Sequence, residues 1–113
     1  MSEDLDQTLA ALADPTRRAI VGLLRQGPRR SGELADALET SRPAMSRHLR
    51  VLRRSRLVAE RIMEDDARGR VYELRPEPFG PLREWLDEVE SFWQDQLGAF
   101  KAHAERGRGK RER

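Results

Sequence analysis

The 113-residue chain has no cysteine, no aromatic residue before Tyr72 and no run of about 18 apolar residues. The missing cysteine excludes disulfides, thiolate metal sites and cysteine nucleophiles. The missing apolar run excludes a membrane-spanning helix, and the acidic residues 1–6 do not resemble a secretory signal. We therefore expect a cytoplasmic protein that has no membrane partner.

Patterns typical of enzymes are also missing. No glycine-rich phosphate loop follows an expected strand, and residues 107–110 do not have the spacing of a P-loop. The neighbouring carboxylates Asp65 and Asp66 lie in a turn-like segment rather than in a cleft, and no serine, histidine and aspartate form a supported set. We expect no catalytic residue, no enzymatic activity and no cofactor.

Charge is distributed unevenly along a chain whose net charge is only +2. Residues 1–16 hold four acidic residues and no basic one, whereas residues 17–62 hold twelve arginines and four acidic residues. Residues 63–104 are acidic again. A basic block between acidic flanks indicates nucleic acid or another anionic surface as a partner.

Apolar periodicity and turn residues predict four short helices in the first half of the chain. Their expected ranges are about residues 5–13, 15–26, 32–38 and 42–54. Capping residues precede the last three: Asp14 before Pro15, Ser31, and either Ser41 or Arg42 before Pro43. In the fourth helix, Met45, Leu49 and Leu52 form a buried stripe, and arginines lie on the opposite side.

A hairpin and a long helix are expected to follow. β-branched residues predict strands over about residues 57–63 and 70–74, joined by a turn that ends at Gly69. The final helix is expected over about residues 80–104, and the basic, glycine-containing residues 105–113 are expected to be a disordered tail. The fold class is thus mainly helical with a small β-hairpin, in one domain over residues 1–104.

Two short helices, the second with an arginine-rich face, followed by a hairpin describe a winged helix-turn-helix. The fourth helix fits a DNA major groove, where arginine reads guanine and serine donates to either base or phosphate. No acidic residue interrupts positions 42–56. The residues expected to contact double-stranded DNA are Ser31, Thr40, Ser41, Arg42, Pro43, Ser46, Arg47, His48, Arg50, Arg54, Arg68 and Arg70. His48 is expected to be half-buried, in a structural role or touching phosphate.

The aromatic residues gather near the end of the chain, where the final helix has an apolar stripe close to a heptad spacing. This stripe is wider than one small core can cover, and apolar residues make up only 37% of the sequence. We therefore expect a homodimer. Its interface residues are expected to be Leu5, Leu9, Leu12, Leu82, Trp85, Leu86, Val89, Phe92, Trp93, Leu97 and Phe100.

Four segments together resemble the ArsR (arsenical-resistance repressor) family of bacterial transcription regulators: Asp14–Arg17, Ser46–Leu52, Leu57-Val58 and Gly69–Leu74. The resemblance covers about residues 5–104. It implies a homodimeric repressor that binds an imperfect palindromic operator. It also implies that the fourth helix reads DNA and that the first and last helices form the dimer interface.

The sequence departs from that family at several points. Glu39 and Arg56 stand where glycine is common, so both positions are expected to take unusual backbone angles. The stretch over residues 32–36 lacks the Cys-x-Cys pair of the family's metal sensors. Asp87, Asp95 and His103 lack the ligand spacings of its other metal sites. The chain therefore resembles the metal-independent branch, and no metal ligand is expected.

Three alternatives remain open at this point. A winged helix can serve as a protein-interaction module, although such a module does not require an acid-free recognition helix. A metal-gated sensor could use carboxylate and histidine ligands alone. A repressor could also respond to a small apolar effector among the aromatic residues of the dimer interface.

Overall fold

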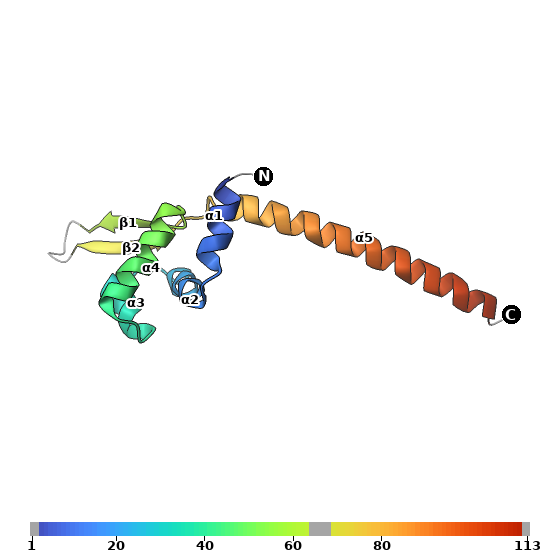
Figure 1. Ribbon diagram of the computed structural model, residues 1–113, viewed down its shortest axis with the longest axis horizontal. Helices are drawn as coiled ribbons and strands as arrows, with labels where there is room; N and C mark the ends of the chain where they lie inside the picture. Colours follow the sequence, from blue (N-terminus) through green and yellow to red (C-terminus); the bar gives the residue numbers. More distant parts are fainter. Residues whose placement is uncertain (1–2, 64–68, 112–113) are drawn as a thin grey trace. The chain divides into compact units, whose positions relative to one another are not determined.

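The computed structural model describes residues 3–63 and 69–111, with side chains as far as Glu105. Within these ranges it contains five helices and one antiparallel pair of strands, in the predicted order (Figure 1). The elements are α1 (Glu3–Leu12), α2 (Pro15–Leu24), α3 (Ser31–Ala37), α4 (Arg42–Arg54), β1 (Val58–Ile62), β2 (Arg70–Leu74) and α5 (Phe79–Arg111). None of the described helices has the length and apolar character needed to cross a bilayer.

The chain divides into two compact units, Met1–Leu82 and Arg83–Arg113. The first unit has a hydrophobic core to which its helices and β1 contribute. The α4 helix packs against α2, α3 and β1. The buried core residues are Ala11, Ile20, Leu24, Leu34, Ala35, Met45, Leu49, Leu52, Leu57 and Val58.

Side-chain caps begin two of the helices as the sequence predicts. The carboxylate of Asp14 accepts a hydrogen bond from the Arg17 backbone N–H at 3.1 Å, and Pro15 is the first residue of α2. The hydroxyl of Ser41 accepts from the Ala44 N–H at 3.2 Å. Ser41, rather than its alternative Arg42, is therefore the N-cap of α4.

The start of α3 differs from the prediction. Ser31 is the first residue of the helix, and Arg30 occupies the N-cap position with extended backbone angles. The Arg30 backbone N–H donates to the Glu33 carboxylate at 3.3 Å. The N-terminus of α3 is thus capped by the carboxylate of Glu33, which accepts from the N-cap backbone in place of the predicted serine cap.

The buried face of α1 differs from the set of leucines, Leu5, Leu9 and Leu12, that the sequence assigns to the dimer interface. Leu5, Thr8 and Ala11 are buried, whereas Leu9 is exposed. Thr8 tolerates full burial because its hydroxyl donates to the Asp4 carbonyl at 2.9 Å. Residues three positions apart lie on the same face of a helix, so Leu5, Thr8 and Ala11 form one buried face.

The hairpin pairs Val58 with Leu74 and Ile62 with Arg70. The first strand, β1, is one residue shorter at each end than the predicted range 57–63. A feature that the sequence did not reveal is a third segment beside β2. The backbones of Arg29 and Tyr72 exchange two hydrogen bonds, of 3.0 and 2.7 Å, which tie the loop after α2 to the hairpin.

The final helix continues beyond its predicted end at Ala104, as far as Arg111. Residues 105–111, for which a disordered tail was predicted, are therefore helical. Gly107 and Gly109 each cost about 1 kcal/mol relative to alanine, but the residues around them are good helix formers and none is proline. Weak breakers of this kind do not end a helix that is already formed.

Candidate nucleic-acid interface

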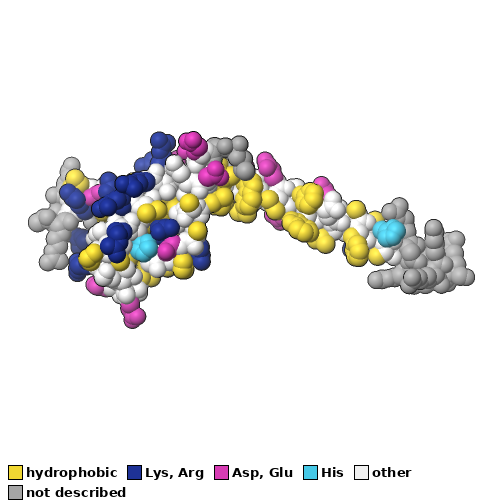
Figure 2. Space-filling model, viewed as in Figure 1, with side chains coloured by type: hydrophobic (Ala, Val, Ile, Leu, Met, Phe, Trp, Pro, Cys, Tyr) yellow, Lys and Arg dark blue, Asp and Glu magenta, His cyan; other side chains and the backbone are white. Residues whose placement is uncertain are grey.

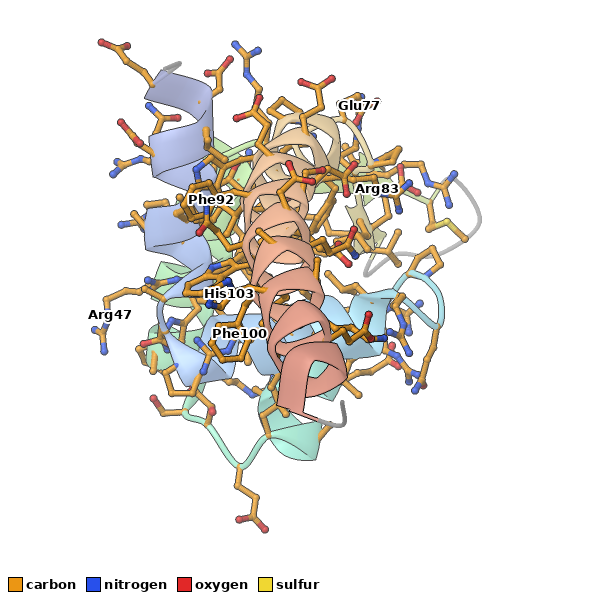
Figure 3. The ribbon with its side chains drawn as sticks, turned by 90° about the vertical axis from the view of Figure 1, so that its right-hand side faces the viewer. Arg47, Glu77, Arg83, Phe92, Phe100 and His103 are labelled. Carbon is orange, nitrogen blue, oxygen red and sulfur yellow. The ribbon has the colours of Figure 1, made fainter. Side chains whose placement is uncertain are left out.

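The α4 helix separates its buried apolar side chains from its exposed basic ones. Met45, Leu49 and Leu52 are buried on one face, as predicted. The opposite face is exposed and holds Arg42, Ser46, Arg47, Arg50 and Arg54. Figure 2 shows Lys and Arg side chains gathered over this part of the chain, and Figure 3 shows Arg47 pointing away from the ribbon. This face presents guanidinium groups without any acidic neighbour on the same helix.

The N-terminal end of α4 lies next to α3, as in a helix-turn-helix. The Arg42 guanidinium lies so close to Gly32 that a Cβ at Gly32 would stand 3.1 Å from its Nη1. Gly32 therefore leaves room for this side chain. The Thr40 hydroxyl donates to the Leu38 carbonyl at 3.2 Å, and the Ser41 hydroxyl already serves as the helix cap. Hydrogen bonds thus orient both hydroxyls at the N-terminus of α4.

Residues with left-handed backbone stand on either side of α4. Glu39 has φ 51° in the turn before the helix, and Arg56 has φ 61° in the turn after it. These are the two positions for which the sequence predicted unusual angles, and that prediction is confirmed. The residue after each one donates back to the preceding helix: the Thr40 N–H donates to the Ala35 carbonyl at 2.9 Å and the Leu57 N–H to the Leu52 carbonyl at 3.0 Å. Glu39 and Arg56 thus help to end α3 and α4.

His48 is half-buried, as predicted, and its Nδ1 lies 3.5 Å from Nη1 of Arg17. Arg17 itself is anchored to the end of α1, because its Nε donates to the Ala11 carbonyl at 2.6 Å. Arg18 donates from Nη1 to the Leu12 carbonyl at 2.7 Å. These contacts satisfy carbonyls that a helix C-terminus leaves without partners.

Sequence reasoning missed this role for Arg17 and Arg18. The signal was available, because α1 has no basic residue in its last turn and two arginines follow immediately in α2. Basic side chains near a helix C-terminus stabilise its last carbonyls. Arg17 and Arg18 therefore belong to the protomer's architecture, and Arg17 positions His48.

The hairpin is joined to α4 through Glu60. This β1 carboxylate forms ion pairs with Arg53 Nη1 at 3.0 Å and with Arg70 Nε at 3.3 Å, and only 16% of its side chain is exposed. Arg70 is therefore held in an ion pair while most of its side chain remains exposed. Tyr72 pairs with Glu60 across the sheet, and burial, followed by the charge of Glu60, raises the pKa of its phenol. The predicted contact Arg68 lies outside the described residues.

The second unit presents an exposed apolar face along α5. Leu86, Phe92, Trp93, Leu97 and Phe100 are each between 49% and 73% exposed. The rings of Phe92 and Trp93 meet edge to face, with centroids 6.1 Å apart, and Figure 3 shows Phe92 and Phe100 on the same side of the helix. Contiguous apolar surface of this kind marks an interaction site.

The other predicted interface residues are less exposed. Leu82, Trp85 and Val89 are half-buried on α5, as is Leu12 on α1. Leu5 is buried within the protomer and leaves almost no surface for a second chain, whereas Leu9 is exposed. In the part of the chain that the structure describes, no three histidine, aspartate or glutamate side chains gather into a potential metal site.

A helix-turn-helix with a basic second helix, followed by a two-stranded wing, defines the winged helix-turn-helix class of protein. The family described as "Bacterial regulatory protein, arsR family" matches residues 14–60, which run from the cap of α2 into β1. The HTH-type transcriptional regulator Rv2034 of Mycobacterium tuberculosis is 46% identical over 95 residues, which span 84% of this chain and 83% of that protein.

Two further comparisons agree. The transcriptional repressor SdpR of Bacillus subtilis is 32% identical over 56 residues, which span 50% of this chain and 62% of that protein. The solved structure of an ArsR-like transcriptional regulator from Rhodococcus sp. RHA1 has a TM-score of 0.73 and 27% identity, and the match covers 90% of this chain and 91% of that one. The chain belongs to the arsR family of bacterial regulatory proteins.

Proposed function

We propose that this protein is a homodimeric, sequence-specific DNA-binding repressor that acts in the cytoplasm on an imperfect palindromic operator. The observation that carries the proposal is the exposed face of α4, where Arg42, Arg47, Arg50 and Arg54 stand without an acidic neighbour. An α-helix fits the major groove, and its N-terminal residues reach the base edges. Repression is supported by the name of the Bacillus relative.

Within α4 the residues have different proposed tasks. Arg42, Pro43, Ser46 and Arg47 lie in the first two turns and are proposed to face bases. Arg50 and Arg54 lie further along the helix and are proposed to contact phosphate. Ser31 and Ser41 are proposed to donate to phosphate beside them, and Thr40 to do so once its hydroxyl turns away from the Leu38 carbonyl. Arg68 and Arg70 are proposed to contact DNA from the wing. Phosphate contacts of this kind fix the register of the protein on the duplex.

The protomers are proposed to meet through the apolar face of α5 together with α1, so that residues 1–104 act as one DNA-binding and dimerisation region. The exposed rings on α5 support this part of the proposal, because covering large apolar groups with a partner lowers the free energy of the system. Two copies would present two α4 helices, which suits an operator with two half-sites.

Fluorescence anisotropy tests the proposal with two labelled duplexes, the protein's own promoter region and a scrambled control. Six to eight phosphate contacts per dimer predict that log affinity falls with log salt at a slope of roughly −5 to −7. We expect a large preference for the promoter duplex together with this steep slope. Equal binding to both duplexes would contradict sequence specificity, and binding to neither at low salt would favour a protein-interaction module instead.

The same assay tests the expectation that no metal gates DNA binding. That expectation rests on the absence of cysteine from the whole sequence. Adding zinc or nickel is expected to leave the affinity for the promoter duplex unchanged. A metal-dependent shift would favour a sensor that uses carboxylate and histidine ligands.

A further inference from the structure

A cavity of about 420 Å³ lies within the unit Met1–Leu82. Its walls come from α1, from the turn after α4, from β1 and from the segment between β2 and α5. None of the exposed residues proposed to face bases lines it. Its size is within the range of small-molecule binding sites, which is about 300–1,000 Å³.

The lining combines apolar surface with positive charge. Val58, Ala59, Pro78 and Pro81 supply the apolar part. Three arginines also line the cavity, Arg53, Arg56 and Arg75. An apolar wall with a few polar groups at fixed positions is typical of a site that orients an organic ligand.

Two of these three arginines already have a carboxylate partner. Arg53 pairs with Glu60, and Arg75 donates from Nε and Nη2 to the two oxygens of Glu77, both at 3.2 Å. Among the residues that the structure describes, Arg56 has no ion pair and no side-chain hydrogen bond. Of the three arginines that line the cavity, Arg56 is therefore the one whose guanidinium has no carboxylate partner.

Arg56 is also held in left-handed backbone, with φ 61°. This conformation is unfavourable for a residue with a Cβ, and glycine would relieve it. The angle ends α4, because the Arg56 N–H donates to the Arg53 carbonyl and the Leu57 N–H donates to the Leu52 carbonyl, both at 3.0 Å. The cap thus fixes the position of the Arg56 backbone at the edge of the cavity.

We propose that this cavity binds a small organic monocarboxylate whose carboxylate is held by Arg56 and whose apolar body contacts Val58, Ala59 and the prolines. A guanidinium presents paired N–H groups that match the two oxygens of a carboxylate. Asp4 and Glu77 also line the cavity. Their negative charges oppose a polyanion such as phosphate more than a ligand with a single charge.

The site lies where occupancy can alter DNA binding, a consequence that rests on the function proposed above. Ser55 and Arg56 join α4 to β1, and Arg53 is on α4 itself. A bound carboxylate adds negative charge beside these arginines and so opposes the approach of DNA phosphates. We expect saturating ligand to weaken binding to the promoter duplex by about fivefold or more.

Calorimetry on the full chain without DNA tests the site on its own. The probe is benzoate, with neutral benzamide, cationic benzylamine and inorganic phosphate as controls of charge and shape. We expect saturable binding of one benzoate per protomer, and binding at least about tenfold weaker for each control. Equal binding of benzylamine or phosphate, or no binding of benzoate, would overturn the proposal.

Two glycine variants distinguish the effect of losing the guanidinium from the effect of relieving a left-handed backbone. Arg56→Gly removes both, whereas Glu39→Gly relieves the same kind of strain on the other side of α4 and leaves the cavity intact. We expect benzoate affinity to fall at least about tenfold in Arg56→Gly and to remain unchanged in Glu39→Gly. Equal affinity in both variants would show that Arg56 does not hold the carboxylate.

Anisotropy with and without benzoate then tests the regulatory consequence. If the protein binds no duplex, the proposed function fails while the calorimetry still decides the site. If benzoate binds through Arg56 but leaves the affinity for the promoter duplex unchanged, the regulatory role is overturned. A loss of DNA affinity on addition of benzoate that occurs in Glu39→Gly but not in Arg56→Gly supports both the site and its role.

Discussion

Arg47 is the residue whose role in DNA recognition can be tested most directly. Its side chain is exposed in the second turn of α4 and points away from the ribbon (Figure 3). Arginine contacts guanine O6 and N7 with two hydrogen bonds, which discriminate against other bases. We expect Arg47→Ala to weaken binding to the promoter duplex by about 1–3 kcal/mol and to relax base preference at one position in each half-site.

Arg54→Ala is the matched control for that prediction, since it makes the same change at the far end of the same helix. A phosphate contact there predicts similar losses on promoter and scrambled duplexes, together with a smaller salt slope. If Arg47→Ala bound both duplexes as the wild type does, base recognition would have to be assigned to another residue.

Asp14 makes stability depend on pH in a predictable direction. Its hydrogen bond from the Arg17 backbone N–H lowers the pKa of the Asp14 carboxyl. A carboxyl whose pKa is lowered by folding stabilises the folded state at pH values above the ordinary pKa of aspartate, which is about 4. This stabilisation is lost as the pH falls through the lowered pKa. We expect Asp14→Ala to lower the melting temperature at pH 7, and the difference from wild type to shrink as pH falls from about 5 to about 3.

Asp14→Asn separates the cap from its charge, because asparagine accepts the same hydrogen bond without titrating in this range. Thermal unfolding followed by circular dichroism measures all three proteins at each pH. Asp14→Asn should lie between the other two at neutral pH. A difference between wild type and Asp14→Ala that stayed constant down to pH 3 would contradict the assigned role of the carboxylate.

Local sequence signals predicted the elements that depend on neighbouring residues. The caps at Asp14 and Ser41 and the buried stripe of α4 follow from chemistry within a few positions. These features involve a side chain and the backbone of the next turn, and so a single sequence carries the whole signal. The left-handed angles at Glu39 and Arg56 were instead expected from the resemblance to a family that commonly has glycine there.

Other elements depend on contacts between distant positions, and these were not predictable in the same way. The pairing of Arg29 with Tyr72 joins segments that are far apart in the chain. The ion pairs of Glu60 with Arg53 and Arg70 also require the fold before they can be seen. The charge of Arg53 and Arg70 could be read from the sequence, but the carboxylate that pairs with both could not.

The exposed apolar face of α5 is the proposed dimer interface. Its exposed rings are expected to form the centre of the dimer interface, where a tryptophan contributes most to the binding free energy. We expect Trp93→Ala to weaken the dimer by about 2 kcal/mol or more, roughly 30-fold in its dissociation constant. Sedimentation should then show the 13.0 kDa monomer at concentrations where the wild type is dimeric.

Asp95→Ala is the control for that variant, because this exposed residue lies two positions along α5, away from the aromatic side of the helix. It should leave the dimer intact. If Trp93→Ala remained dimeric at the same concentrations, the interface would have to lie on another part of the molecule, with the exposed Leu9 on α1 as the next position to test.

At the scale of the whole molecule, the two units have separate proposed tasks that only an assembled dimer combines. The unit Met1–Leu82 contains α4 and the wing, and the unit Arg83–Arg113 contains most of the exposed apolar face of α5. One α4 helix can occupy one half-site. The proposed dimer would convert two weak half-site contacts into a single tight complex, because the second contact would be intramolecular.

This division of tasks predicts how the operator must be spaced. A twofold dimer holds its recognition helices at a fixed separation, so half-sites should lie about 10 base pairs apart, centre to centre, or a multiple of that. Inserting about 5 base pairs between the half-sites turns the second one to the opposite face of the duplex. We expect affinity to fall toward that of non-specific DNA, which is typically about 10³-fold weaker or more. The same insertion placed outside the operator should have no effect in anisotropy. If the internal insertion also had no effect, each protomer would have to bind independently, and the dimeric mode of DNA recognition would be wrong.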